Sequence, residues 1–398
     1  MKAGWKIKSL GEMCHVIGGG TPPKDKPEYY TGNIPWATVR DMRSDVITKT
    51  EFKITREAIK ASSTNVIPSN NVIIATRVGL GKVCLIEQDT AINQDLRGIV
   101  PNDPKKLEVR FLFWWLKSIS DSIVAEGTGA TVQGVKLPFI KGLSLPLPPL
   151  PEQQRIVSIL DEAFDGIATA KANAEKNLLN ARALFESHLN AVFSQRGEGW
   201  VEQKKPLADM CELIVDCEHK TAPTQEEGFP SIRTPNIGKG KLLLDGVYRV
   251  SEETYRDWTR RAEPLPGDLI FAREAPAGNV AVIPKNLKVC LGQRTVLIRP
   301  RRHIFESEFL ALILLQPPMQ RKLLDHSRGA TVQHVNMKDI RALDIGSIPP
   351  LSVQREIVSV VDNISKQNER LESIYRQKLS ALDALKKSLL DQAFTGRL

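Results

Sequence analysis

Side chains able to read the edges of DNA bases recur at matching places in the two halves of this chain, in stretches expected to be loops. Arg, Asn and Gln can each make two hydrogen bonds to a guanine or adenine edge, which direct base recognition requires. Any one of them equally suits a solvated loop, and only their clustering at equivalent loops favours contact with DNA. The candidates are, in the first half, Thr21, Thr38, Arg40, Arg43, Thr76, Arg77, Gln94 and Arg97, and, in the second, His219, Lys220, Arg233, Asn236, Arg273, Asn279, Gln293 and Arg294.

Catalytic and cofactor-binding patterns are not evident. Residues 79–82, Gly-Leu-Gly-Lys, lack the spacing and the following hydroxyl residue of a phosphate-binding loop. The spacing of Cys211, Cys217 and His219 matches no common zinc pattern. Cys211 lies in an apolar run, and we interpret it as a buried structural thiol. No histidine has a paired serine and aspartate in a familiar arrangement. The sequence therefore predicts no catalytic residue, no metal site and no cofactor.

The pentapeptide Gly-Ala-Thr-Val-Gln occurs twice, at residues 129–133 and 329–333. Matching stretches surround both copies in the same order, which indicates an internal duplication over nearly the whole chain. Thr131, Gln133, Thr331 and Gln333 are further DNA-contact candidates, although the glycine and small polar residues suit a tight turn at least as well. The matching pairs are 10–17 with 207–214, 71–86 with 268–283, and 149–164 with 350–365.

Each half is expected to consist of a globular region followed by a long helix. Short β-rich runs broken by Gly, Pro and Asn, with one apolar helical stretch, predict mixed α/β regions at 1–148 and 197–348. Segments 149–196 and 349–398 each predict a helix of more than 40 residues, the first with Pro151 in its first turn. The fold class is therefore α+β.

Apolar and small residues recur in both predicted helices with the three-four spacing of a coiled-coil seam. We expect the helices to pair antiparallel, as a rod of roughly 65 Å that would hold the globular regions apart. The predicted seam positions are Ile156, Leu160, Ala163, Ile167, Ala170, Ala174, Asn177, Ala181, Leu184, His188 and Ala191, followed in the second helix by Ile357, Val361, Ile364, Asn368, Leu371, Tyr375, Lys378, Leu382, Leu385 and Leu389.

Composition and charge describe a folded protein with a polyanionic partner. The 398 residues are 41% hydrophobic and 25% charged, and they exceed what a single hydrophobic core usually serves. The net charge is +9, and the first region carries the largest share of it; this surplus favours polyanionic partners but does not by itself identify nucleic acid. Five scattered cysteines predict reduced thiols, and no signal peptide or membrane span is evident. We expect a cytoplasmic protein without a membrane partner.

These features together resemble the specificity subunit of type I restriction-modification systems, over essentially all of the chain. The most specific stretches are residues 127–138 (GTGATVQGVKLP), 145–163 (LPLPPLPEQQRIVSILDEA) and 388–398 (SLLDQAFTGRL). The resemblance implies two target-recognition domains, separated by two long antiparallel coiled-coil helices and related by an internal pseudo-two-fold repeat. Each domain would read one half of a bipartite, asymmetric target in double-stranded DNA. The helices would dock two methyltransferase (modification) subunits and set the spacer, and restriction subunits would then join the complex.

Two other functions remain open at this point. A stand-alone DNA methyltransferase or nuclease would act without partners. However, the Asn/Asp-Pro-Pro-aromatic signature of an adenine methyltransferase is absent from the sequence. A coiled-coil scaffold with protein-binding ends would show DNA binding that is absent or insensitive to salt, because phosphate neutralisation weakens as salt rises.

Overall fold

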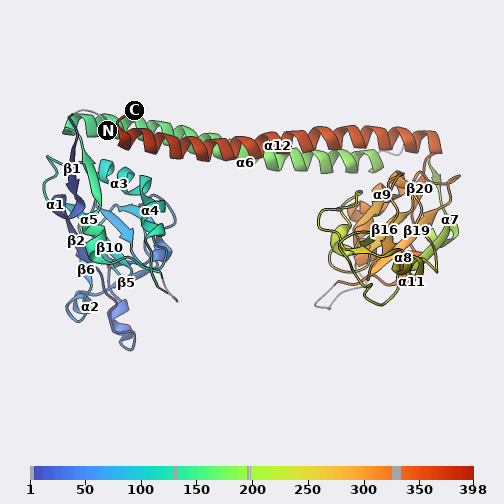
Figure 1. Ribbon diagram of the computed structural model, residues 1–398, viewed down its shortest axis with the longest axis horizontal. Helices are drawn as coiled ribbons and strands as arrows, with labels where there is room; N and C mark the ends of the chain where they lie inside the picture. The colour runs from blue at the N-terminus through green and yellow to red at the C-terminus, as the bar shows by residue number, and fades with distance from the viewer. Residues whose placement is uncertain (1–3, 130–132, 195–196, 198, 325–332) are drawn as a thin grey trace. The chain divides into compact units, whose positions relative to one another are not determined.

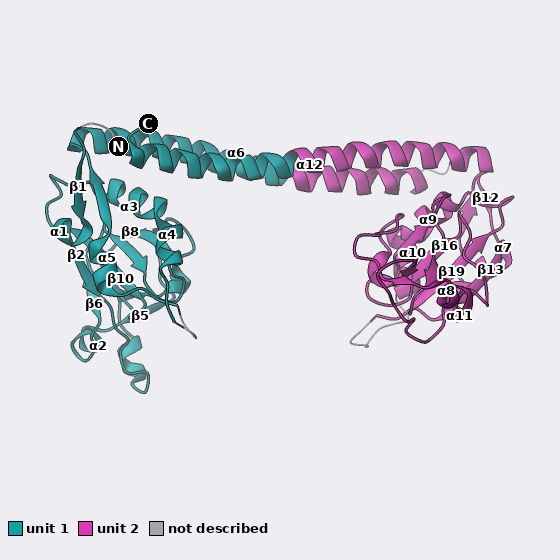
Figure 2. Ribbon diagram, in the orientation of Figure 1, with its two compact units in different colours: residues 1–177, 375–398 teal, residues 178–374 magenta. Residues whose placement is uncertain are grey.

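The computed structural model describes residues 4–129, 133–194, 197, 199–324 and 333–398 (Figure 1). The chain forms two compact units, coloured separately in Figure 2. Unit 1 comprises Met1–Asn177 with Tyr375–Leu398, and unit 2 comprises Leu178–Ile374. Each unit therefore contains one globular α/β domain together with part of each of the two long helices.

The domain of unit 1 is built on a five-stranded sheet of order β2-β10-β7-β8-β4. Its strands are β2 (Cys14–Gly18), β10 (Leu96–Pro101), β7 (Val72–Ala75), β8 (Val83–Ile86) and β4 (Val46–Ile47). A four-stranded sheet contains β5 (Phe52–Ile54), β3 (Ile34–Ala37), β9 (Thr90–Ile92) and β6 (Asn65–Ile67), and β1 (Lys6–Ser9) pairs with β11 (Ser144–Leu147). The short helices are α1 (Leu10–Met13), α2 (Arg56–Lys60), α3 (Val109–Ser118), α4 (Ser120–Ala125) and α5 (Leu137–Gly142), with 3-10 turns η1 (Pro27–Tyr30) and η2 (Val39–Asp41).

The domain of unit 2 repeats this plan. The order β13-β19-β16-β17 corresponds to β2-β10-β7-β8, and the parallel pair β14·β18 corresponds to β3·β9. The strands are β12 (Val201–Glu202), β13 (Cys211–Asp216), β14 (Phe229–Ile232), β15 (Arg249–Val250), β16 (Leu269–Ala272), β17 (Val280–Val282), β18 (Cys290–Leu291), β19 (Thr295–Pro300) and β20 (Ser347–Ile348). The helices are η3 (Thr234–Asn236), α7 (Leu207–Met210), α8 (Glu252–Trp258), α9 (Ser307–Leu315), α10 (Pro317–Leu324) and α11 (Met337–Arg341).

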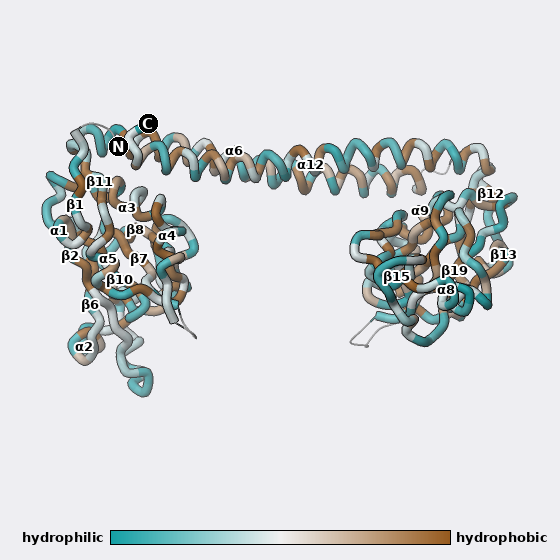
Figure 3. Tube along the Cα trace, viewed as in Figure 1, coloured by the Kyte–Doolittle hydropathy of each residue, from teal (hydrophilic) through white to brown (hydrophobic). Residues whose placement is uncertain are grey.

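The strands and the apolar helix of each domain form the core. All four residues of β7 and of β16 are buried, because these strands lie in the interior of their sheets. Helix α3 packs on β7 and β8 and buries Phe111, Phe113 and Trp115, each at most 2% exposed. Burying one such aromatic side chain stabilises the fold by roughly 2–3 kcal/mol. Figure 3 shows these hydrophobic segments inside each domain.

The long helices are α6 (Leu150–Ser194) and α12 (Leu351–Thr395), each of 45 residues. Their pairing is antiparallel within each unit. In unit 1, Arg155 donates to the backbone carbonyl of Leu398, and Lys171 lies 2.6 Å from Asp383. In unit 2, Arg182 lies 3.2 Å from Glu372. The predicted long helices and their antiparallel pairing are thereby confirmed within the units.

The predicted seam holds in the first part of α6 and is wrong further along. Leu160, Ile167, Ala174 and Ala181 are buried as predicted. Leu184 is 71% exposed, however, and the next residue, Phe185, faces inward instead. Leu371 and Leu385 of α12 are also exposed. In a helix with 3.6 residues per turn, residues spaced by a strict seven-residue repeat rotate gradually around the helix axis. Far along α6 the buried position is therefore one residue later than the repeat predicts.

Both long helices have a buried glutamine in their first turn. Gln153 in α6 is 0% exposed, and Gln354 in α12 is 1% exposed. Each side chain accepts a hydrogen bond from the backbone of a glutamate, Glu108 or Glu306, just ahead of α3 or α9. Each also donates to two backbone carbonyls, one of them from the proline-rich segment before its own helix. The helix beginnings are therefore equivalent, although only the first has the Pro-Glu-Gln sequence.

All five cysteines are buried and unpaired, which confirms the interpretation of Cys211 as a buried thiol. Burial raises the pKa of Cys14 and of Cys211 to about 12, and that of Cys84 to about 11. Within the described residues, no helix is long and apolar enough to cross a membrane. The same residues contain no cluster of three His, Cys, Asp or Glu that could hold a metal ion.

We expect the native chain to resist alkylation at pH 8. A thiol reacts as the thiolate, and burial raises the pKa of all five thiols, including Cys217 and Cys290, above the ordinary value, which leaves little thiolate at that pH. Intact mass spectrometry after iodoacetamide treatment should show no label on the native chain and five labels after unfolding in urea. Rapid labelling of even one cysteine in the native chain would contradict this burial.

Candidate nucleic-acid interface

In unit 1, the ends of strands bring several candidate residues together. The Thr21 hydroxyl contacts the Gln94 amide oxygen, across 73 residues of sequence. Arg97 lies beside them, on β10, and its guanidinium donates to the backbone carbonyls of Gln94 and Leu96 at 3.0 and 2.8 Å. Burial, followed by the nearby Arg77 charge, lowers the pKa of Arg97. Two arginines and two neutral polar side chains therefore lie around one turn between β9 and β10.

The residues on either side of the repeated pentapeptide of unit 1 are attached to the same place. Thr128 and Gly134 form a bridge across the loop, and the Val135 amide donates to the Thr76 carbonyl at 2.9 Å. Gly134 lies so close to this backbone that an added Cβ would be 3.1 Å from the Thr76 oxygen. Gln133 is exposed next to it. Gly134 and Val135 are thus held against Thr76, the residue that precedes Arg77.

Unit 2 builds the same corner with different side chains. Its Val335 amide donates to the Arg273 carbonyl at 2.9 Å, as Val135 does to Thr76. The Arg273 guanidinium is 12% exposed and donates to Asp216 at 2.6 Å. It also contacts His334, whose other ring nitrogen lies 3.0 Å from Glu274. A charged network therefore replaces the mainly neutral contacts of unit 1.

An ion pair recurs at this corner with its charges exchanged. In unit 1, Arg77 is paired with Asp95 at 3.6 Å, and in unit 2, Glu274 is paired with Arg294 at 2.9 Å. The two pairs occupy corresponding positions. Thr76, which precedes Arg77, donates its backbone N–H to the Asp95 carbonyl, and Arg273, which precedes Glu274, donates its own to the Arg294 carbonyl. The exposed arginine is therefore the earlier residue of the pair in unit 1 and the later residue of the pair in unit 2. Arg294 is 62% exposed and holds a φ of 67°, a left-handed conformation uncommon for arginine.

The other candidates lie at three kinds of place. Thr76 is 2% exposed, and Asn236 and Asn279 donate to backbone carbonyls inside their own domain. Thr38 caps η2 through its hydroxyl. Arg40 is exposed within η2. Those on exposed loops are Arg43, His219, Lys220 and Arg233, with Gln293 partly exposed and Gln333 exposed beside His334; Thr131 and Thr331 lie outside the described residues.

The partners of these side chains were missed from the sequence. Asp95, Asp216, Glu274 and His334 are acidic or titratable residues next to candidates, yet a base-reading argument gives no reason to select them. His334 directly follows the second pentapeptide, where Gly134 follows the first. A comparison of what changes immediately after the repeat would have identified it.

The fold and these corners define a duplicated protein in which each copy has an α/β domain, a polar corner at its strand ends and a long helix. The chain belongs to the family of type I restriction modification DNA specificity domains, whose family model matches residues 2–180 and 198–379. Both copies of the repeat are thus covered by the same family model.

Individual relatives agree with this membership. The specificity subunit of the type I restriction enzyme EcoR124I/EcoR124II from Escherichia coli is 35% identical over 170 residues, which are 41% of this chain and 41% of that protein. The MjaIX specificity subunit from Methanocaldococcus jannaschii is 28% identical over 262 residues, which are 61% of this chain and 59% of that protein. The matches therefore span about two fifths and three fifths of the length of these relatives.

A solved structure shares the fold. A chain from work on the complex assembly and conformational transition of the type I R-M system matches with a TM-score of 0.78 at 22% sequence identity. The match covers 100% of this chain and 99% of that chain.

Proposed function

We propose that this chain is the non-catalytic DNA sequence-recognition subunit of a type I restriction-modification complex. The observation that carries the proposal is that one family model, for a DNA specificity domain, matches each half of the chain. Each globular domain then reads one half of a bipartite, asymmetric target. The chemistry of methylation and cleavage belongs to other subunits.

The polar corners supply the recognition chemistry in this proposal. Arg77 and Arg294 are 51% and 62% exposed, and an arginine fork can hold the O6 and N7 atoms of guanine. Their carboxylate partners orient the guanidinium before DNA arrives, which lowers the cost of ordering it on binding. Because the pair is exchanged between the units, the two domains present different patterns of donors and charge. Two different half-sites, and hence an asymmetric target, follow from this difference.

The long helices serve the assembly in the same proposal. Two methyltransferase subunits dock on them, restriction subunits join through that complex, and the whole acts on cytoplasmic DNA. The helices also set the spacer, since half-sites read from one face of B-DNA lie about one helical turn apart, roughly 34 Å. The names of the relatives, which are specificity subunits of type I restriction enzymes, support this assignment.

Exchange of one domain tests the proposal. Residues 1–148 are replaced by the corresponding domain of another specificity subunit, and methylated adenines are mapped genome-wide in cells that carry the native or the exchanged chain. We expect one half of the target to change while the other half is kept. Loss of both halves with an intact complex, or methylation that is independent of the chain, would refute the proposed reading of half-sites by separate domains.

A further inference from the structure

The two units have equivalent junctions between a domain helix and a long helix, and the junctions are filled differently. In unit 1, α3 packs on α6, and in unit 2, α9 packs on α12. The buried glutamines Gln153 and Gln354, which bind the backbone ahead of α3 and α9 in the same way, fix the correspondence. Positions along the helices can therefore be compared one by one.

In unit 1, a tryptophan fills the junction. Trp114 of α3 is 5% exposed and lies edge-on to Phe164 of α6, with ring centroids 4.7 Å apart. Its indole N–H donates to the Asp161 carboxylate at 2.9 Å, and Arg110 also binds this carboxylate at 2.8 Å. Lys386 of α12 lies over the Phe164 ring at 4.9 Å. The carboxylate thus receives both an indole N–H and a cation.

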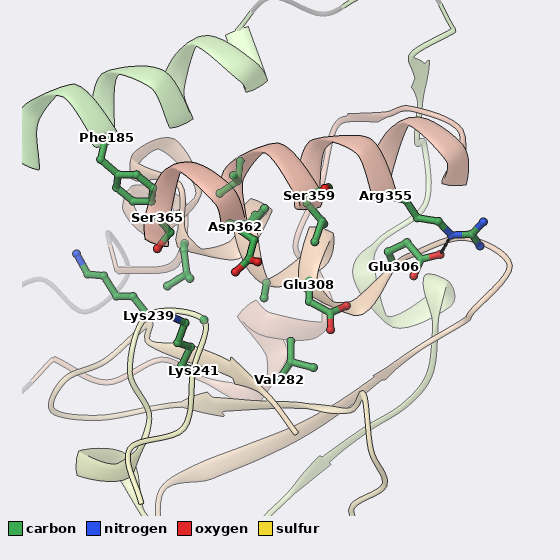
Figure 4. Close-up of a pocket in the computed structure, with 16 residues that line it drawn as sticks. Phe185, Lys239, Lys241, Val282, Glu306, Glu308, Arg355, Ser359, Asp362 and Ser365 are labelled. Atoms are coloured by element: carbon green, nitrogen blue, oxygen red, sulfur yellow. Dashed lines mark hydrogen bonds and ion pairs between the residues drawn. The ribbon is translucent and has the colours of Figure 1, made fainter. Parts of the chain in front are cut away.

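In unit 2, smaller residues stand at the corresponding positions and leave a cavity of about 510 Å³. Leu312 replaces Trp114, Ser365 replaces Phe164, and Ala311 replaces Phe113. Figure 4 shows the side chains that line this cavity, with Phe185 at one end. Phe185 lies at the same position along α6 that Lys386 has along α12.

Unit 2 keeps the carboxylate that accepts the indole N–H in unit 1, but it lacks the tryptophan and the arginine that bind this carboxylate there. Asp362 occupies the position of Asp161 and lines the cavity. Its only ion pair from a described residue is with Lys366, one turn along the same helix, at 2.6 Å. Glu308, also in the lining, replaces Arg110, so the cation of unit 1 becomes a second carboxylate.

The lining also contains Lys239, Lys241, Arg355 and Glu306. Arg355 pairs with Glu306 at 2.7 Å, and Lys241 pairs with Glu369 at 2.9 Å, while Lys239 lies at the end of the cavity where Phe185 is. Among the described residues, neither Glu308 nor Asp362 pairs with a cation from another element, and beside the aromatic wall these two carboxylates favour an aromatic ring that carries an N–H donor and a nearby positive charge.

We infer that this cavity of unit 2 binds a tryptophan-type side chain of a partner protein, with a basic group beside it. The indole takes the place that Trp114 fills in unit 1, against Leu312 and Phe185, and donates to Asp362, while the basic group pairs with Glu308. The volume lies within the range of about 300–1,000 Å³ that is usual for ligand pockets. Under the proposed function the partner is a methyltransferase subunit, and to that extent the inference rests on the proposed function.

The ligand class is tested with tryptamine, which has an indole N–H and an ammonium group. Tryptamine is titrated into the full chain, with the methyl groups of Leu312, Val358 and Val361 followed by NMR. We expect saturable binding with a Kd on the order of 1 mM, as for other ligands of about a dozen heavy atoms. 1-Methyltryptamine, which lacks the N–H donor, should bind at least about five-fold more weakly.

Filled and control variants make this test specific. Leu312→Trp, which restores the residue of unit 1, should abolish tryptamine binding, whereas Leu244→Trp, on an exposed position of the same unit, should leave it unchanged. Ser365→Phe serves as a second filled variant if Leu312→Trp does not fold. Equal binding to the native and filled chains, or no saturable binding to the native chain, would overturn the inference.

The source of the side chain is tested in the complex. Methyltransferase subunit is titrated onto the native, Leu312→Trp and Leu244→Trp chains, and the copies bound are counted by native mass spectrometry. We expect Leu312→Trp to weaken one of two copies by about ten-fold, with Leu244→Trp like the native chain. Equal binding of both copies to all three chains would overturn the protein origin of the ligand. Failure of the native chain to recruit any copy would instead overturn the proposed function, while tryptamine binding would still decide the ligand class.

Discussion

Replacing Gln153 by alanine should destabilise unit 1 by about 3 kcal/mol or more, and Gln354→Ala should do the same in unit 2. Each amide is buried and makes three hydrogen bonds to the backbone, all of 2.9 to 3.0 Å. Alanine would leave two carbonyls and one N–H without their partner in a buried junction. Each unsatisfied buried group costs about 1–3 kcal/mol. The loss is large because the amide joins the beginning of a long helix to the segment before α3 or α9.

Hydrogen exchange resolved by peptide would locate this effect, since each substitution should speed exchange in its own unit and leave the other unit protected. Gln154→Ala is the matched control, because Gln154 is the exposed neighbour of Gln153. Its effect should stay within about 0.5 kcal/mol, as for most surface substitutions. A loss below about 1 kcal/mol for Gln153→Ala would mean that water can satisfy the groups that the amide now serves.

Exchanging the charges of the Arg77–Asp95 pair should impair reading of one half-site. The double change Arg77→Glu with Asp95→Arg gives unit 1 the pair that unit 2 has at Glu274 and Arg294, so an internal ion pair can still form. The exposed arginine then comes from the other side of the turn. Loss of one bidentate base contact costs about 1–3 kcal/mol, or roughly 5- to 150-fold in affinity. Competition binding on targets altered in one half at a time would measure it.

The control for this experiment is the same kind of charge exchange, made in an ion pair that lies outside the polar corner. Asp257, near the end of α8, and Arg260, just after this helix, form an exposed pair at 2.8 Å, and Arg260→Asp with Asp257→Arg also leaves the net charge unchanged. DNA affinity should then change less than about two-fold, as expected for an exposed pair. If the exchange at 77 and 95 left both half-sites equally well bound, this corner would not be the reading surface of unit 1.

The long helices show how far a sequence pattern reaches. The absence of internal proline and the spacing of apolar residues predict two helices of more than 40 residues, and both are present. The same spacing predicts Leu184 in the seam, whereas Phe185 takes that place. A seven-residue pattern assumes 3.5 residues per turn, as in a supercoiled pair. When the helix has nearer 3.6 residues per turn, the predicted seam departs further from the buried face with every turn. Element type was therefore predictable, and the facing residue far along the helix was not.

The polar corners show a different limit. Arg77 and Gln94 could be selected from the sequence because arginine and glutamine suit base edges. Nothing local to Arg273 predicts that its guanidinium binds Asp216 and His334, which lie 57 and 61 residues away. Thr76 occupies the position in unit 1 that Arg273 has in unit 2. Thr76 is buried and the Arg273 side chain is nearly buried, because the segment that follows the pentapeptide lies over both residues. Which candidate is exposed depends on contacts between distant segments.

The sequence by itself determined the duplication, the two long helices, the buried thiols and the types of residue available at the strand ends. These features depend on periodicity, composition and order along the chain, which do not require knowing which segments meet in space. The tertiary structure alone decided that an ion pair recurs with exchanged charges, and that unit 2 has a cavity where unit 1 has Trp114. Both result from the packing of segments that are far apart in sequence, because a side chain's partners and the space around it are fixed only when those segments meet.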